Sequence, residues 1–194
     1  DLQAREPKRL KAVKADVSTS TGRTHLLTAL RRHYSFTLDI LVNNVGTNLR
    51  KPSEKYSDAE YDDLCATNQG SAFHLSRGCF DALRPRKGCI INVSSVSGST
   101  VDSTGCPYHM NKAALEHMTR CAAGGDNSRC QRARAPAPRP ALPGPPALGT
   151  SMRSLHRRLH LSRPRRYLAC EWGPLGIRVN AVAPWFINTP LTAP

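Results

Sequence analysis

Tyr108 and Lys112, with Ser95 thirteen residues upstream, are the side chains of this sequence best suited to acid–base chemistry. A tyrosine and a lysine four residues apart lie on one face of a helix. A lysine ammonium beside a phenol favours the phenolate, so we expect Tyr108 to exchange a proton near neutral pH. The Ser95 hydroxyl, on a separate segment, can hydrogen-bond the same substrate oxygen. The group predicts reduction of a carbonyl or oxidation of an alcohol, with a dinucleotide carrying the hydride.

The bulk composition suits one domain of 194 residues with a hydrophobic core of its own. The seven cysteines lack the paired spacing of metal ligands, and His156 and His160 have no cysteine or carboxylate nearby, so we expect no metal. The odd number of cysteines and the lack of a visible secretory signal favour reduced thiols and a cytoplasmic location, with organellar targeting left open. No apolar run reaches the ~20 residues of a membrane-spanning helix.

The net charge of +14 is concentrated in one part of the chain. Residues 121–167 hold ten of the 28 Lys and Arg residues but only one of the 14 acids. Outside this segment the chain is mildly basic, which argues against a nucleic-acid-binding protein. The Arg-rich run 153–166 leaves RNA or a membrane surface open as a weaker alternative.

Strand and helix patterns alternate along the first 120 residues. A capping-box pattern opens one helix at Ser57, because Glu60 follows three residues later. The expected strands are 10–15, 39–42, 89–93 and 177–182, and the other expected helices are 24–33, 68–83 and one that starts near Tyr108. The alternation predicts an α/β fold with a doubly wound, Rossmann-like parallel sheet that lacks its first strand–helix–strand unit.

Residues 122–167 interrupt this pattern. Seven of the fifteen prolines fall there or at its edges, and several stand in runs that cannot continue a helix. We predict a poorly ordered Pro/Arg-rich insert at 122–167 between two parts of one domain, 1–121 and 168–194. Translated intron or a frameshift would explain such a sequence.

Several motifs follow one another along the chain. They are Leu41-Val42-Asn43-Asn44-Val45-Gly46-Thr47-Asn48, Ala66-Thr67-Asn68, Val93-Ser94-Ser95-Val96-Ser97-Gly98, Tyr108-xxx-Lys112, Leu168-Ala169-Cys170-Glu171-Trp172, Ile177-Arg178-Val179-Asn180 and Ala183-Pro184-Trp185-Phe186-Ile187-Asn188-Thr189-Pro190. In these motifs and their order the chain resembles the short-chain dehydrogenases/reductases, and within them the plant tropinone reductase-like branch. Each motif is only modestly specific, but all occur in family order.

The resemblance implies a role for each matched residue. The implied catalytic residues are Asn68, Ser95, Tyr108 and Lys112, with Ser95 and Tyr108 also touching the substrate. The implied cofactor contacts are Asp16, Asn43, Val45, Gly46, Tyr108, Lys112, Pro184, Ile187 and Thr189. Tyr108 would exchange the proton, Lys112 would hold the nicotinamide ribose, and Asn68 would support a water-mediated proton relay. Asp16 would meet the adenine, although it is equally well placed to cap the helix that follows.

The resemblance also implies hydride transfer between NADP(H) or NAD(H) and a ketone or secondary alcohol, and it favours NADP(H). Family members assemble as homodimers or tetramers, which the insert would obstruct. The sequence departs from the family because the glycine-rich phosphate turn is absent and because 122–167 splits the helix that carries Tyr108. A catalytically impaired remnant or mis-annotated gene product is therefore the alternative to an active reductase.

Overall fold

The computed structural model describes residues 10–101, 105–119, 167–185 and 187. The insert predicted at 122–167 lies outside the described residues, apart from its last residue, which begins a helix. The helices are α2 (Ser20–Tyr34), α3 (Asp58–Cys65), α4 (Ser71–Gly78), α5 (Phe80–Leu83), α6 (Cys106–Thr119) and α8 (Tyr167–Trp172), with the π-helix η2 (Ala66–Gly70) and the 3-10 turns η1 (Ser53–Lys55), η3 (Val96–Gly98) and η5 (Gly173–Leu175). None of these helices is both long and apolar enough to cross a membrane.

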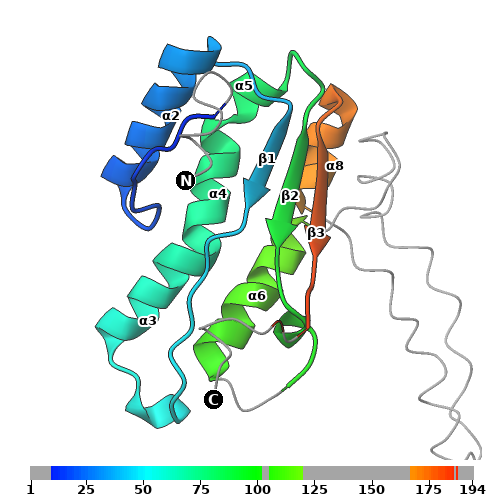
Figure 1. Cartoon of the computed structure of the whole chain (residues 1–194). Coiled ribbons are helices and arrows are strands. Elements are labelled where there is room, and N and C mark those ends of the chain that lie inside the picture. The colour runs from blue at the N-terminus through cyan, green and yellow to red at the C-terminus, as the bar shows by residue number, and fades with distance from the viewer. Residues whose placement is uncertain (1–9, 102–104, 120–166, 186, 188–194) are drawn as a thin grey trace, which may run out of the picture.

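Three parallel strands form the sheet, in the order β1 (Ile40–Asn43), β2 (Cys89–Val93) and β3 (Arg178–Val182). Their register pairs Ile40 with Cys89, and Cys89 with Arg178. In Figure 1 the three strands point the same way, so that their carboxyl ends meet at one edge of the sheet. The helical segments between them make the parallel crossovers that this topology requires.

The strands predicted at 39–42, 89–93 and 177–182 are confirmed within a residue or two, but the strand predicted at 10–15 is wrong. Residues 10–16 have no regular structure. An alternating segment becomes a strand only when a neighbour accepts and donates its backbone hydrogen bonds. Within the described residues the sheet ends at β1, and no strand lies beside 10–15.

The helices were predicted more accurately than that first strand. Helix α2 contains the predicted 24–33, and its N-cap Thr19 accepts a hydrogen bond from the backbone of Gly22 at 3.0 Å. The capping box at Ser57 is present, because both reciprocal bonds with Glu60 form. The helix predicted at 68–83 consists of η2, α4 and α5, and α6 starts two residues before Tyr108.

The hydrophobic core lies between the sheet and the helices that cover one of its faces (Figure 1). Leu83, Ile90 and Ile177 are fully buried at its centre, and Leu168 from α8 packs with them. Each such side chain contributes about 1.5–3 kcal/mol when removed from water. Helix α8 also packs against α6, so the sequence on both sides of the insert contributes to one core.

Candidate active site

The loops after β1, β2 and β3 meet at the carboxyl edge of the sheet. The chain leaving β3 follows the chain leaving β2, because Ser94 N donates to Val182 O at 2.7 Å and Val96 N donates to Pro184 O at 3.1 Å. Ser95 is therefore held between two backbone bonds to the segment that carries Pro184. Open α/β sheets bind ligands at this edge, beyond the ends of the strands.

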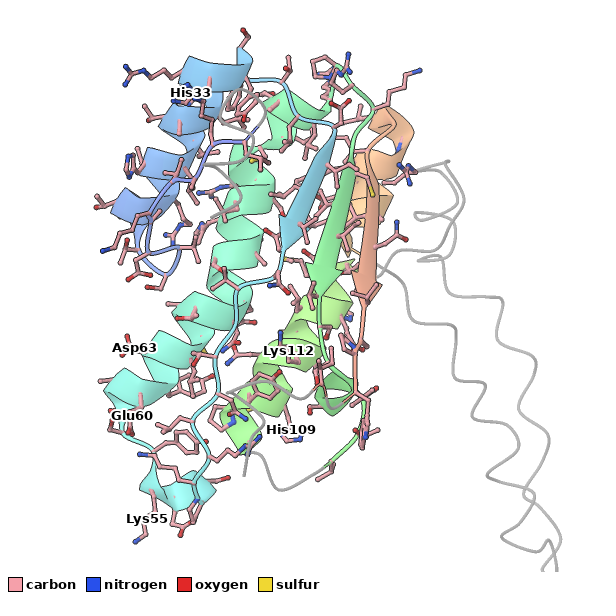
Figure 2. The ribbon with its side chains drawn as sticks, in the orientation of Figure 1. His33, Lys55, Glu60, Asp63, His109 and Lys112 are labelled. Atoms are coloured by element: carbon pink, nitrogen blue, oxygen red, sulfur yellow. The ribbon has the colours of Figure 1, made fainter. Side chains whose placement is uncertain are left out.

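Lys112 enters this edge from α6, as Figure 2 shows, beyond the carboxyl ends of the strands. Its side chain is buried, and Nζ donates a hydrogen bond to Val93 O at 2.9 Å. Nζ also lies 5.5 Å from the centroid of the Tyr108 ring, one helical turn earlier. Burial lowers the pKa of Lys112 from its ordinary 10.5 to about 8, because the charged form loses its water. At neutral pH the amine therefore keeps its charge in a partly desolvated position.

Tyr108 occupies the first turn of α6 and is half-buried. The start of that helix is held by His109, whose Nδ1 lies 2.9 Å from Gly105 O. The Tyr108 and His109 rings meet edge to face, with 6.4 Å between their centroids. The predicted juxtaposition of Tyr108 with Lys112 on one helix is thus present in the structure.

Ser95 directly precedes the turn η3 and caps it. Its Oγ accepts a hydrogen bond from Ser97 N at 3.2 Å and lies 3.3 Å from Ser97 Oγ. The turn packs against α6, which brings the Ser95 segment to the helix of Tyr108 and Lys112. The contact of Ser95 with a substrate oxygen stays a prediction.

Asn68 is 1% exposed and sits in the middle of the π-helix η2. Single π-turns of this kind often mark functional sites. Its amide makes three hydrogen bonds: Oδ1 accepts from Thr47 N at 3.0 Å, and Nδ2 donates to Thr47 O at 3.0 Å and to Leu64 O at 2.8 Å. Asn68 therefore fixes the loop after β1, next to Gly46.

At Gly46 the loop after β1 closely approaches the side chains of Asn68 and Lys112. A Cβ at this position would lie 3.0 Å from Asn68 Oδ1 and 3.4 Å from Lys112 Nζ. A side chain at Gly46 would thus displace one of them. The structure therefore brings three of the predicted residues into one place, although they lie far apart in the sequence.

The remaining predicted cofactor contacts have different surroundings. Val45 and Ile187 are exposed near this edge, whereas Thr189 lies outside the described residues. The Asp16 carboxylate accepts hydrogen bonds from Ser18 Oγ and Ser18 N, at 2.7 and 2.9 Å, and these bonds hold the pKa of that carboxyl below its ordinary 3.8. Asp16 therefore bonds the turn before α2 and does not cap that helix, whose N-cap is Thr19, and the adenine contact stays a prediction.

The side chain of Asn43 belongs to a buried polar network beneath the sheet. Its Nδ2 donates to Asn92 Oδ1 at 2.8 Å and to Ser76 Oγ at 3.0 Å. Asn92 Nδ2 in turn donates to Thr119 Oγ1 at 2.8 Å, which links β1 and β2 to α6. The structure thus gives the Asn43 side chain a part in holding the strands, and its role toward a cofactor stays a prediction.

Beside the Ser95 turn there is a hollow of about 830 Å³. Ser97 and Gly98 form one wall, the exposed side of α6 at Cys106 and His109 forms another, and residues 50–53 form the third. Ser97 connects this hollow to the site, because its hydroxyl lies next to that of Ser95. Among the described residues, no cluster of three His, Cys, Asp or Glu side chains could hold a metal ion.

Two buried residues in this region were not singled out from the sequence. Ser94 Oγ lies 3.2 Å from both Lys112 O and Glu116 Oε1. The signal that could have found Glu116 is its position four residues after Lys112, which places an acid on the inner face of the same helix.

Comparison with known proteins identifies the family to which this site belongs. The family described as short chain dehydrogenase matches residues 1–126. The chain is therefore a member of the short-chain dehydrogenase/reductase family, as its motifs predicted, and its fold is the Rossmann-like α/β fold of that family.

Within the family the chain is similar to plant tropinone reductase homologs. A tropinone reductase homolog from Arabidopsis thaliana is 33% identical over 177 residues, which cover 91% of this chain and 50% of that protein. A chloroplastic tropinone reductase homolog from the same plant is 31% identical and is covered to 40% of its length. The chain thus spans about half the length, or less, of the curated relatives it matches.

Solved structures of bacterial proteins share the fold. A short chain dehydrogenase/reductase from Brucella ovis has a TM-score of 0.64 at 24% identity, over 97% of this chain and 71% of that one. An oxidoreductase of the same family from Brucella ovis, in complex with a partially ordered NAD, has a TM-score of 0.60 at 25% identity, over 89% of this chain and 61% of that one.

Proposed function

We propose that the chain is the core of an NAD(P)-dependent reductase that interconverts a ketone and a secondary alcohol. The observation that carries the proposal is the position of Lys112 Nζ, which lies close to the Tyr108 ring, the Val93 carbonyl and Gly46. A buried amine beside a phenol, at the ends of parallel strands, is the arrangement that proton exchange with a bound substrate needs.

The residues at this edge fit a dinucleotide. Gly46 and Asn68 form a cradle whose space a Cβ would fill, and Lys112 offers an ammonium group to a ribose or phosphate oxygen. Asn43, Val45, Pro184, Ile187 and Thr189 are the further proposed contacts. When bound, the nicotinamide supplies the hydride. NADP(H) is proposed ahead of NAD(H), and the related oxidoreductase that carries NAD supports a nicotinamide cofactor in general.

The chain's own residues account for the proton side of the reaction. The Ser95 hydroxyl donates a hydrogen bond to the carbonyl oxygen and orients it. Tyr108 then gives its phenolic proton to that oxygen as negative charge develops there, and Lys112 favours the phenolate that remains. Asn68 holds the Thr47 backbone and supports the relay that returns a proton to Tyr108. In the direction of alcohol oxidation the same groups act in reverse.

The substrate is proposed to be a small ketone, for which the hollow beside Ser97 leaves room. The names of the relatives suggest tropinone as the first ketone to try. A family-like homodimer and a cytoplasmic location remain predictions, and one relative is described as chloroplastic.

A direct test measures NADPH and NADH binding to the full chain by calorimetry, followed by turnover with tropinone and with cyclohexanone, a neutral cyclic ketone. We expect binding that weakens at least tenfold in Lys112→Met, while the exposed Lys55→Met leaves it unchanged. Absence of binding to both dinucleotides in a folded wild-type chain would refute the proposal.

The second candidate is a remnant that folds but does not turn over, and the Pro/Arg-rich segment 122–167, which follows the helix of Tyr108 and Lys112, favours it. A chain with 122–167 deleted joins Cys121 to Leu168 and distinguishes the two. If only the deleted form, extended by a glycine-rich turn upstream, reduces ketones, the chain that contains 122–167 is the remnant. Transcripts that join Cys121 directly to Leu168 would support the same conclusion.

A further inference from the structure

Glu116 is a buried acid in a position that the proposed reaction leaves unexplained. It lies on α6, one turn after Lys112, and is 6% exposed. Its Oε1 is 3.2 Å from Ser94 Oγ, which directly precedes Ser95 in the chain. The Ser94 hydroxyl also lies 3.2 Å from Lys112 O, and of the two acceptors a carboxylate is the stronger.

Glu116 also contacts the far side of the Ser95 turn. A Cβ on Gly98 would lie 2.7 Å from Glu116 Oε1 and 3.0 Å from the backbone carbonyl carbon of Lys112. A side chain at Gly98 would thus collide with the Glu116 carboxylate and approach the α6 backbone closely, so the carboxylate or the turn would have to shift. Glu116 therefore meets residues that flank Ser95 on both sides.

Two hydrogen bonds couple the position of turn η3 to that of Ser95. Ser97 N donates to Ser95 Oγ at 3.2 Å, and Gly98 N donates to Ser95 O at 2.9 Å. These two bonds define the direction of the Ser95 hydroxyl relative to the turn. A contact that holds turn η3 against α6 thus also fixes the position of the Ser95 hydroxyl relative to Tyr108, which lies on α6.

We propose that Glu116 is a positioning residue, which holds turn η3 against α6 and thereby keeps the Ser95 hydroxyl aimed at the substrate oxygen. The proposal rests on the proposed function, because Ser95 matters only if a carbonyl oxygen binds there. Glu116 itself touches no reacting atom. Its Oε1 acceptor is the feature that counts, so glutamine should replace it and leucine should not.

The first test follows the backbone of the turn and does not need turnover. Amide hydrogen exchange of Ser97 and Gly98 is measured by NMR in the full chain. In Glu116→Leu we expect exchange at both amides to rise about tenfold or more, with the amide of Ile90 in β2 unchanged. Glu116→Gln and the exposed control Glu171→Leu should match the wild type. Unchanged exchange at Ser97 and Gly98 in Glu116→Leu would overturn the proposal.

The second test asks whether the position of the turn matters for the reaction. With NADPH and cyclohexanone, Glu116→Leu should lower kcat about tenfold with an unchanged KM for NADPH, and Glu116→Gln should restore kcat. Glu116→Leu could instead speed exchange equally at Ser97, Gly98 and Ile90 and leave kcat unchanged. That result would mean that Glu116 only stabilises the fold, and it would overturn the proposal. If the wild type lacks turnover, the proposed function fails, and the exchange data alone decide whether Glu116 holds the turn.

Ser94→Ala provides a milder variant in case Glu116→Leu does not fold. It removes the hydroxyl proton that Glu116 accepts but adds no bulk. We expect about threefold faster exchange at Ser97 and Gly98. In the Ser94→Ala, Glu116→Leu double variant the effect should be no larger than in Glu116→Leu alone, because both changes act on one contact. Fully additive effects in that double variant, or unchanged exchange at Ser97 and Gly98 in Ser94→Ala, would contradict the proposal.

Discussion

The buried amine of Lys112 should give the chain an unusual dependence of stability on pH. Burial lowers its pKa in the folded state from 10.5 to about 8. Below pH 8 the amine is charged in both the folded and unfolded states, so the cost of burying the charge is fully present. Above pH 10.5 it is neutral in both, and the cost disappears. The free energy of unfolding therefore rises with pH between these two values, because the unfolded chain binds more protons there.

The size of this effect follows from the pKa difference. The pKa difference of about 2.5 corresponds to roughly 3 kcal/mol, which is the cost of burying the charged amine. Between pH 7 and pH 10 the free energy of unfolding should regain about 2.5 kcal/mol of this cost. Cys79 acts in the opposite direction at higher pH, because burial raises the pKa of its thiol from 9.0 to about 11. The folded state keeps that proton between pH 9 and 11, so stability is lost over that range. The wild-type curve should rise from pH 8 and then flatten.

The variant Lys112→Met isolates the contribution of the amine. It removes the charge but also leaves Val93 O without its donor, which costs about 1–3 kcal/mol at every pH. The difference in unfolding free energy, wild type minus Lys112→Met, should therefore rise by about 2.5 kcal/mol from pH 7 to pH 10. Because Cys79 is present in both proteins, its contribution cancels.

Urea unfolding followed by tryptophan fluorescence measures this difference. Trp172 reports on the core, because its ring lies 5.1 Å from that of Phe80. The exposed Lys55→Met serves as the matched control, for which the difference from wild type should not change with pH. A difference that stays flat within about 0.5 kcal/mol for Lys112→Met would show that the amine is not desolvated, and the reasoning about the site would fail with it.

Three further changes test the site and the network beneath it. Tyr108→Phe should abolish ketone reduction while NADPH binding by calorimetry stays within about threefold of wild type, since only the proton donor is lost; retained turnover would exclude Tyr108 as the acid. Gly46→Ala should weaken NADPH binding by about tenfold or more, because the added Cβ meets Asn68 Oδ1 at 3.0 Å; unchanged binding would show that the loop can shift. Thr119→Val should lower the free energy of unfolding by about 1–3 kcal/mol, because it leaves Asn92 Nδ2 buried without its acceptor; a change below about 0.5 kcal/mol in urea unfolding would contradict the network.

Much of the fold could be predicted from local patterns. The continuous apolar runs predicted β1 and β2, although Ile40 and Val42 of β1 are exposed in the structure. The capping box at Ser57 predicted where α3 begins. The prediction of a strand at 10–15 was wrong because local pattern does not settle whether a strand finds a neighbour. Its alternation is a local property, whereas a strand depends on a partner elsewhere in the chain.

The candidate site was predicted as a set of residues, and the Tyr108–Lys112 pair follows from helical spacing alone. The depressed pKa of Lys112 could not be predicted in this way, because it depends on how much protein covers the amine. The same holds for Asn43, whose match to a family motif suggested a cofactor contact, while its amide lies in a network with Asn92 and Ser76.

The sequence by itself determined which chemistry this protein can attempt, because side-chain types and their spacing on one helix depend only on the order of the residues. Tertiary structure decided what surrounds those groups. It placed Gly46 against Asn68 and Lys112, and it seated the Ser95 turn on the carboxylate of Glu116. Distances between segments far apart in the chain, and the loss of water that packing brings, are set only when the strands and helices come together.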